Sequence, residues 1–164
     1  MNVSAEYALI RARDMFRGAT FDSMCVHGDQ IDLGFLNDTA IEGGLVAVGL
    51  IFGCDAVVYD FTSSKNNARG AIDNDPLASR MEFVSRAYCL IGNAVADVSI
   101  GAGGKLNLLV KPFGTITLRP QQSDVAHGDW VWKASIDRTN DAPRNLYCAF
   151  EDDQAIFVCD SDIE

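Results

Sequence analysis

Apolar residues recur mostly at every second position between Leu90 and Lys133, the most strongly patterned part of the chain. They form three runs: Val95, Val98 and Ile100; Leu106, Leu108 and Val110; and Ile116 and Leu118. The glycine-bearing segments 101–105 and 111–114 separate these runs. Period-two alternation places side chains on alternate faces of a strand, and glycine permits tight turns, so the segment predicts an antiparallel meander.

The beginning of the chain predicts a helix followed by a hairpin. Ser4 is a suitable N-cap for a helix that runs to Phe16, because its hydroxyl can accept a hydrogen bond from the first turn. After this helix, apolar residues alternate on both sides of the turn residues Gly28 and Asp29, which predicts two paired strands. The alternation slips by one residue just after Phe21.

These two patterned segments resemble each other. Shifting the first by 74 residues aligns Gly18 with Gly92 and Phe21 with Val95, and one added residue then keeps the later strands aligned. One identical glycine and eight apolar positions correspond in this alignment. We therefore expect two related units of strand, turn, strand, turn and strand, at about 16–43 and 90–118, which can pack with pseudo-twofold symmetry.

The segments between the units contain further expected elements. Residues 45–61 hold two apolar runs whose valines and glycines favour strands over a helix, although periodicity alone does not separate the two. Residues 62–76 are polar and predict an exposed loop that links the halves. Ser79 with Glu82 resembles the capping box of a second short helix, expected over 79–90.

The C-terminal segment predicts a last hairpin from the strands 146–150 and 155–159. If Phe150 faces Ala155, then Cys148 lies opposite Phe157. With the other elements this gives a single α+β domain over residues 1–164. It is mainly antiparallel β-sheet, with two related hairpin units and two short helices.

A formal net charge of −10 determines which partners are expected. Residues 20–75 hold nine acidic residues against two basic ones, and residues 151–164 hold six acidic residues and no basic one. Such carboxylates repel phosphate and anionic lipid, so neither nucleic acid nor a membrane is an expected partner. They attract a basic protein, whose arginines they can bind through charge-assisted hydrogen bonds. The alternative is that these acidic runs form only a solvated face.

The five cysteines lie far apart in apolar runs, and no two form a Cys-x-x-Cys pair. This spacing favours reduced core thiols over a zinc or dithiol redox site. The N-terminus lacks the order of regions found in a secretory signal, and the most apolar run, 45–52, is too short to span a bilayer. We therefore expect a cytoplasmic protein.

No motif predicts catalysis, and we expect neither a catalytic residue nor a cofactor. His27 and His127 each occur in a His-Gly-Asp tripeptide, which could ligate a metal if the two loops met but is also common turn material. The glycines of 101–104 superficially resemble a phosphate loop, but no Gly-Lys-Ser/Thr follows, so a hairpin loop is expected. Trp130 and Trp132 can form an exposed aromatic anchor, although core packing is the default.

The central segment also resembles a known protein family. The residues that carry the resemblance are Leu90, Gly92, Val95, Val98, Gly104, Leu106, Leu108, Gly114, Ile116, Leu118 and Trp130. They are similar to a pattern in small bacterial immunity proteins: a glycine-led strand, a Gly-Lys-Leu hairpin, a second glycine turn and a downstream tryptophan. The similarity covers about 45 residues and extends loosely to the earlier unit. The chain departs from the pattern at His127-Gly-Asp, where the family has an acidic residue close to the tryptophan.

The resemblance implies a non-enzymatic inhibitor that binds the C-terminal effector domain of a polymorphic toxin, such as those of contact-dependent growth inhibition. Many such toxins are nucleases, whose basic surface suits an acidic inhibitor, although some immunity proteins bind away from the active site. The expected toxin-binding residues are Asp29, Asp32, Asp73, Asp75, Glu151, Asp152 and Asp153. Two alternatives stay open: a protein that binds a metal or small ligand through His27 and His127, and a homo-oligomer that pairs exposed strand edges.

Overall fold

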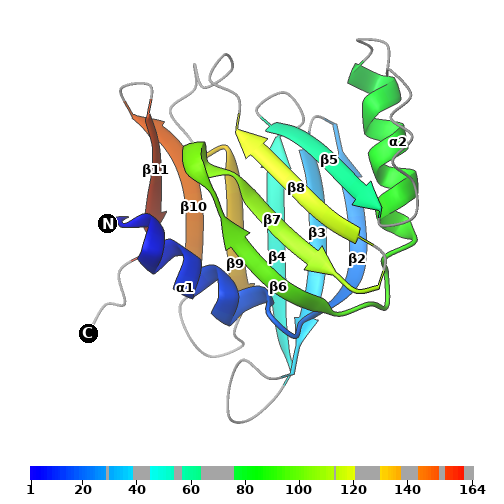
Figure 1. The fold of residues 1–164 in the computed structure, drawn as a ribbon, viewed down its shortest axis with the longest axis horizontal. Helices are drawn as coiled ribbons and strands as arrows, with labels where there is room; N and C mark the ends of the chain where they lie inside the picture. The colour runs from blue at the N-terminus through cyan, green and yellow to red at the C-terminus, as the bar shows by residue number, and fades with distance from the viewer. Residues whose placement is uncertain are drawn as a thin grey trace.

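The structure is a computed structural model that describes residues 1–28, 30–38, 45–53, 57–63, 76–112, 114–120, 130–137, 144–151 and 154–160. Within these residues it shows the α+β fold expected from the sequence, with two α-helices and two antiparallel sheets (Figure 1). The predictions of strands rather than a helix in 45–61 and of a central meander are both confirmed, with strands over 46–53 and 57–63.

The larger sheet, sheet A, has seven strands. In spatial order they are β1 (Asn2–Val3), β11 (Gln154–Cys159), β10 (Arg144–Glu151), β9 (Trp132–Asp137), β4 (Val46–Gly53), β3 (Gln30–Asn37) and β2 (Thr20–His27). The last hairpin has the expected register, with Phe150 facing Ala155 and Cys148 facing Phe157. The slip in the pattern after Phe21 is a β-bulge in β2, where one extra residue interrupts the pairing with β3.

The smaller sheet, sheet B, has four strands and lies across the front of sheet A in Figure 1. Its order is β5 (Val57–Ser63), β8 (Gly114–Pro120), β7 (Leu106–Val110) and β6 (Val95–Ile100). The glycines of 101–104 form the loop between β6 and β7, including the short 3-10 turn η1 (Ala102–Gly104), so the hairpin loop is confirmed.

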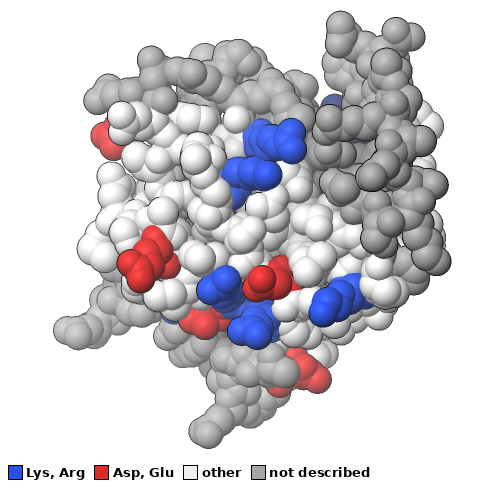
Figure 2. All heavy atoms as spheres, in the orientation of Figure 1, with Lys and Arg blue, Asp and Glu red and all other residues white. Residues whose placement is uncertain are grey.

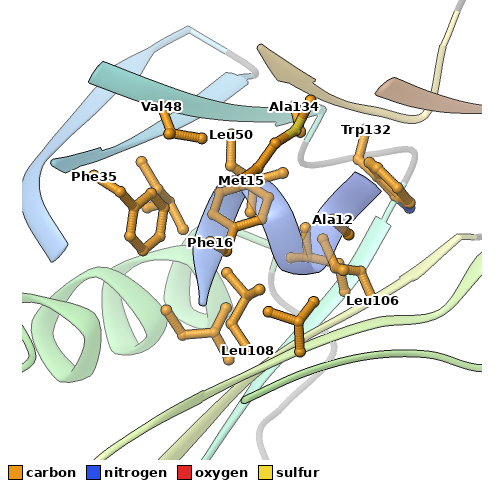
Figure 3. Packing of buried hydrophobic residues seen from close by; sticks show 14 of the residues in the cluster. Ala12, Met15, Phe16, Phe35, Val48, Leu50, Leu106, Leu108, Trp132 and Ala134 are labelled. Carbon is orange, nitrogen blue, oxygen red and sulfur yellow. The ribbon is translucent and has the colours of Figure 1, made fainter. Parts of the chain in front are cut away.

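Helix α1 (Ala5–Phe16) packs one buried side into the core between the sheets, while its other side is exposed. Figure 3 shows Ala12, Met15 and Phe16 pointing from the helix into the core, with residues of sheet A on one side and Leu106 and Leu108 of sheet B on the other. The Phe16 ring packs edge-on against Phe35 with centroids 5.2 Å apart. Fully buried side chains of this size each contribute about 1.5–3 kcal/mol to folding, so α1 is integral to the core.

Both ends of α1 are held by side chains. The Ser4 hydroxyl accepts a hydrogen bond from the Tyr7 amide at 3.1 Å, which confirms the predicted cap. At the other end the buried Asn37 amide donates to the Met15 carbonyl at 2.8 Å and satisfies an oxygen that the helix leaves free. The Arg13 guanidinium donates to the Val98 carbonyl at 3.2 Å and fastens the helix to β6.

The second helix differs in its bounds from the prediction. Helix α2 (Pro76–Tyr88) starts three residues before Ser79 and stops before Leu90. Proline suits the first turn of a helix because its missing N–H would have had no partner there. The predicted linking loop 62–76 is too long at both ends, because Thr62 and Ser63 belong to β5 and Pro76 belongs to α2. Residues 64–75 lie outside the described chain.

The two sheets meet where β2 and β6 begin. Gly18 and Gly92 both have positive φ, +85° and +86°, a conformation that glycine adopts without strain. The Gly18 amide donates to the Val95 carbonyl at 2.8 Å, and the Gly92 amide donates to the Phe21 carbonyl at 2.7 Å. The two bonds are equivalent in the alignment of the two units, because each joins the aligned glycine of one unit to the aligned apolar residue of the other. Thr20 and Ala94, which are also aligned with each other, form a β-bridge between the units. We call this arrangement the crossing.

Candidate protein interface

One face of sheet A lies in the core, and no described element covers the other face. In Figure 1 sheet B and α1 lie on the same side of sheet A. Burial alternates accordingly along β3, where Ile31, Leu33 and Phe35 are buried but Asp32 is only half-buried. We call this uncovered surface the open face. Its described residues on the inner strands are Asp32, Gly34, Leu36, Ala47, Gly49, Ile51, Lys133, Ser135, Asn145, Tyr147, Ala149, Ile156 and Val158.

A row of larger side chains crosses the middle of the open face. The pairing register places in line Cys25 of β2, Asp32 of β3, Ile51 of β4, Lys133 of β9, Tyr147 of β10 and Val158 of β11. Aliphatic and aromatic groups thus stand beside one carboxylate and one ammonium group. A half-exposed tyrosine among apolar neighbours is typical of the centre of a protein interface.

The neighbouring row of the open face has short side chains on β2, β3, β4 and β9, before it reaches Asn145 on β10. Ser23, Gly34, Gly49 and Ser135 are aligned there by the register. A Cβ atom at Gly34 would collide with the Ser23 hydroxyl, and one at Gly49 would lie 3.2 Å from the Ser135 Oγ. The backbone is therefore close to the surface in this row, which leaves the taller central row accessible from the side.

Two of the seven predicted toxin-binding residues lie within the described chain, and both are on the open face. Asp32 is 35% exposed, and its Oδ2 lies 3.8 Å from the Nε2 of His27. The Oδ1 of Asp32 has no hydrogen-bond partner among the described residues. Glu151 is exposed at the end of β10, where it accepts a long hydrogen bond of 3.5 Å from the Asn2 amide.

The structure separates Asp32 from Glu151 by β4 and β9. Three strand spacings correspond to roughly 14 Å across the sheet. Lys133, which was not among the predicted residues, lies between them on β9. The other five predicted acidic residues, Asp29, Asp73, Asp75, Asp152 and Asp153, are outside the described part of the chain.

The front of the molecule carries charge of both signs. In Figure 2 the described basic and acidic groups over sheet B are interspersed in small clusters. Asp97 illustrates this mixing, because its carboxylate lies 3.8 Å from the Arg13 guanidinium. The described residues therefore give no reason to place an acidic contact surface on sheet B.

The remaining sequence candidates separate into core and surface. Core packing, the default expectation, is confirmed for Trp132, which is fully buried and donates its indole N–H to the Gly104 carbonyl at 2.9 Å. Trp132 is therefore not an exposed anchor. Trp130 is half-buried. His27 is 64% exposed, whereas His127 lies outside the described residues. Within the described chain, no three His, Cys, Asp or Glu side chains are grouped as metal ligands.

Sequence patterns missed Ile51, Lys133, Tyr147 and Val158 as neighbours. Each alternates with buried residues in its own strand, so each could have been assigned to an outward face. Their common row depends on the pairing of β4 with β9 and of β9 with β10. The first of these pairings joins segments far apart in the chain, and no local pattern encodes it.

Comparisons with models of known protein families, with curated proteins and with solved structures found no match. No helix within the described ranges is long and apolar enough to cross a membrane.

Proposed function

We propose that this protein is a cytoplasmic immunity protein, which binds and neutralises the effector domain of a polymorphic toxin without catalysing a reaction. The observation that carries the proposal is the open face of sheet A, with its central row of Ile51, Lys133 and Tyr147. A seven-stranded sheet with one face that no described element covers offers a broad and rigid surface, which suits a protein partner better than a small ligand.

The charges of the chain favour a basic partner. The net charge of −10 attracts a basic toxin domain over a distance and raises the rate of encounter. On the open face, Asp32 and Glu151 offer carboxylate oxygens to the partner's arginines. Lys133 stands between them and requires an acceptor at one position of the partner. This arrangement of charges would select one toxin among several basic ones.

The first experiment is co-purification with a candidate toxin. The tagged protein is expressed with the C-terminal domain of any large toxin-like reading frame immediately upstream of its gene. We expect a one-to-one complex and restored growth of cells that produce the toxin domain. The association rate should fall as salt is raised from 50 to 500 mM, because the Debye length shortens from roughly 14 to 4 Å. Absence of both capture and rescue would overturn the proposal.

Two pairs of variants test the open face within that complex. Tyr147→Ala should weaken binding about 30-fold, whereas Tyr88→Ala on α2, where the side chain is 69% exposed, should change it less than about twofold. Glu151→Lys should slow association several-fold and flatten its salt dependence, whereas Glu6→Lys on α1 should do neither. Equal effects within each pair would place the contact surface elsewhere.

A further inference from the structure

Along most of its length, the outer edge of β2 pairs with no strand in the described part of the chain. At its start, Phe21 is tied to β6, since its amide donates to the Asn93 carbonyl at 2.9 Å and its carbonyl accepts from Gly92. Beyond the bulge, from Ser23 to His27, no described residue pairs with this edge. We call the segment Ser23–His27 the β2 edge.

The register identifies the backbone groups that face outward. His27 and Gln30 close the turn of the β2–β3 hairpin, and a closing pair of this kind exchanges hydrogen bonds between its strands. Bonded and non-bonded pairs alternate from there, so the N–H and C=O groups of Met24 and Val26 point away from β3. The bulge shifts this alternation by one residue, which is why Phe21 also points outward to reach β6.

The sequence of the β2 edge lacks the residues that usually block strand pairing. Helix α2 contacts the hairpin just beyond this segment, where the Arg80 guanidinium donates a hydrogen bond to the Gly28 carbonyl. Natural sheets protect exposed edges with lysine, proline or inward-pointing charges. The segment Ser23–His27 contains no Lys, Arg, Asp, Glu or Pro, and the side chain of Val26 is 41% exposed. The bulge and Asp22 lie at its start and leave the next five residues open.

The two faces of the β2 edge differ in character. Met24 and Val26 lie on the core side, where Met24 already packs against buried residues. Cys25 and His27 lie on the other side, in the plane of the open face, next to the carboxylate of Asp32. A strand added to this edge would therefore place apolar residues beside Val26 and basic residues toward Asp32, in strict alternation.

We propose that the β2 edge binds an extended segment of a basic protein as an additional strand of sheet A. The segment exchanges main-chain hydrogen bonds with Met24 and Val26 and alternates basic with apolar residues. This inference rests on the proposed function, because it describes how the same partner is held beside the open face. Charge excludes a second copy as the preferred occupant, since that copy would bring another net −10 to the contact.

The test uses a phage-displayed library of random linear dodecapeptides, selected on the immobilised full-length protein. Val26→Pro removes the outward N–H without removing a bond to β3, and Val26→Thr is the matched control that keeps the N–H. We expect the enriched peptides to alternate basic and apolar residues, to bind Val26→Thr like the wild type, and to bind Val26→Pro at least 10-fold more weakly. In the wild type, hydrogen exchange at the Met24 and Val26 amides should slow when peptide is bound.

The exchange measurement needs no variant, so it decides the question even if Val26→Pro fails to fold. Failure to enrich alternating peptides, or enriched peptides that leave the Met24 and Val26 amides unprotected, would overturn strand addition. So would dimerisation of the free protein that Val26→Pro abolishes, because a second copy would then be the occupant. If Val26→Pro bound the toxin with unchanged affinity, strand addition would be wrong but the proposed neutralisation of the toxin would still hold. If the selected peptides bound the β2 edge but no toxin was captured, strand addition would hold and the proposed neutralisation would be wrong.

Discussion

Gly104, in the loop between β6 and β7, lies against residues of β9, β10 and β11. It has φ +75°, its carbonyl accepts the Trp132 indole N–H, and a Cβ there would collide with the Cys148 sulfur. The same Cβ would also lie 3.2 Å from the Ala155 Cβ. The loop between β6 and β7 thus reaches across to sheet A, and only glycine fits at the point of contact.

Gly104→Ala should therefore be strongly destabilising. Backbone strain at positive φ and overpacking against Cys148 together should lower the free energy of unfolding by about 3 kcal/mol. Gly103→Ala is the matched control, because Gly103 also has positive φ, +67°, but has open space around its Cα. It should cost only about 1 kcal/mol in urea unfolding. Equal losses for the two variants would mean that the contact with sheet A is not tight.

The Cys148 thiol should make stability depend on pH in alkaline solution. Burial raises the pKa of this thiol from 9.0 to about 12. The unfolded chain then loses the proton above about pH 9 while the folded chain keeps it, so this contribution is complete below pH 9 and is lost between pH 9 and 12. Between pH 8 and 10, the wild type should lose about 1 kcal/mol more unfolding free energy than Cys148→Ala.

Urea unfolding under reducing conditions at both pH values measures this difference. Titration of the other groups is common to the two proteins and cancels. Parallel losses in both would show that Cys148 ionises in the folded protein as readily as in the unfolded one.

At the scale of elements, the crossing joins the edge strands β2 and β6 of the two sheets. The amides of Gly18, Phe21, Gly92 and Val95 all donate there, over distances of 2.7–2.9 Å. Because the bonds link both sheets beside the core, opening them requires the two sheets to separate.

Native-state hydrogen exchange should therefore divide β2 into two parts. The four crossing amides should exchange slowly and with similar opening free energies, whereas Met24 and Val26 in the same strand should exchange orders of magnitude faster. If Phe21 exchanged as fast as Val26, the crossing would be a weak contact that opens without separating the sheets.

Local elements could be predicted from the sequence because neighbours in the chain determine them. Period two located the meander and the last hairpin, and the slip after Phe21 marked the bulge in β2. The start of α2 was misplaced because Ser79 and Glu82 fit a capping box, while Pro76 is equally suited to a first turn. Each of these outcomes depends on a few adjacent residues.

At the scale of the whole molecule, the decisive pairings lie between distant strands. β5 follows strands β2, β3 and β4 of sheet A in the sequence but pairs with β8 in sheet B. β9 follows the strands of sheet B in the sequence but pairs with β4 in sheet A. The alternation of apolar and polar residues indicates which side of a strand is buried, but it does not indicate which strand is its partner. The open face could not be predicted for this reason, since its central row exists only once β4, β9 and β10 are aligned.

The acidic character of the chain, in contrast, could be predicted from the sequence. The place of the acidic residues on the folded surface could not. Asp32 and Glu151 are far apart in the chain, and the fold brings them to one face with Lys133 between them. Composition predicts that a basic partner will be attracted. The order of strands determines which residues such a partner would meet.

The pairing of β4 with β9 also has a consequence for folding during synthesis on the ribosome. Phe52 faces Trp132, so β4 leaves the exit tunnel long before its neighbour has been synthesised. The ribosome adds roughly 5–20 residues per second, so the edge of β4 that pairs with β9 stays without its partner for on the order of 5 s. Speed of translation and access to chaperones during that interval should therefore govern the yield of folded protein in the cell.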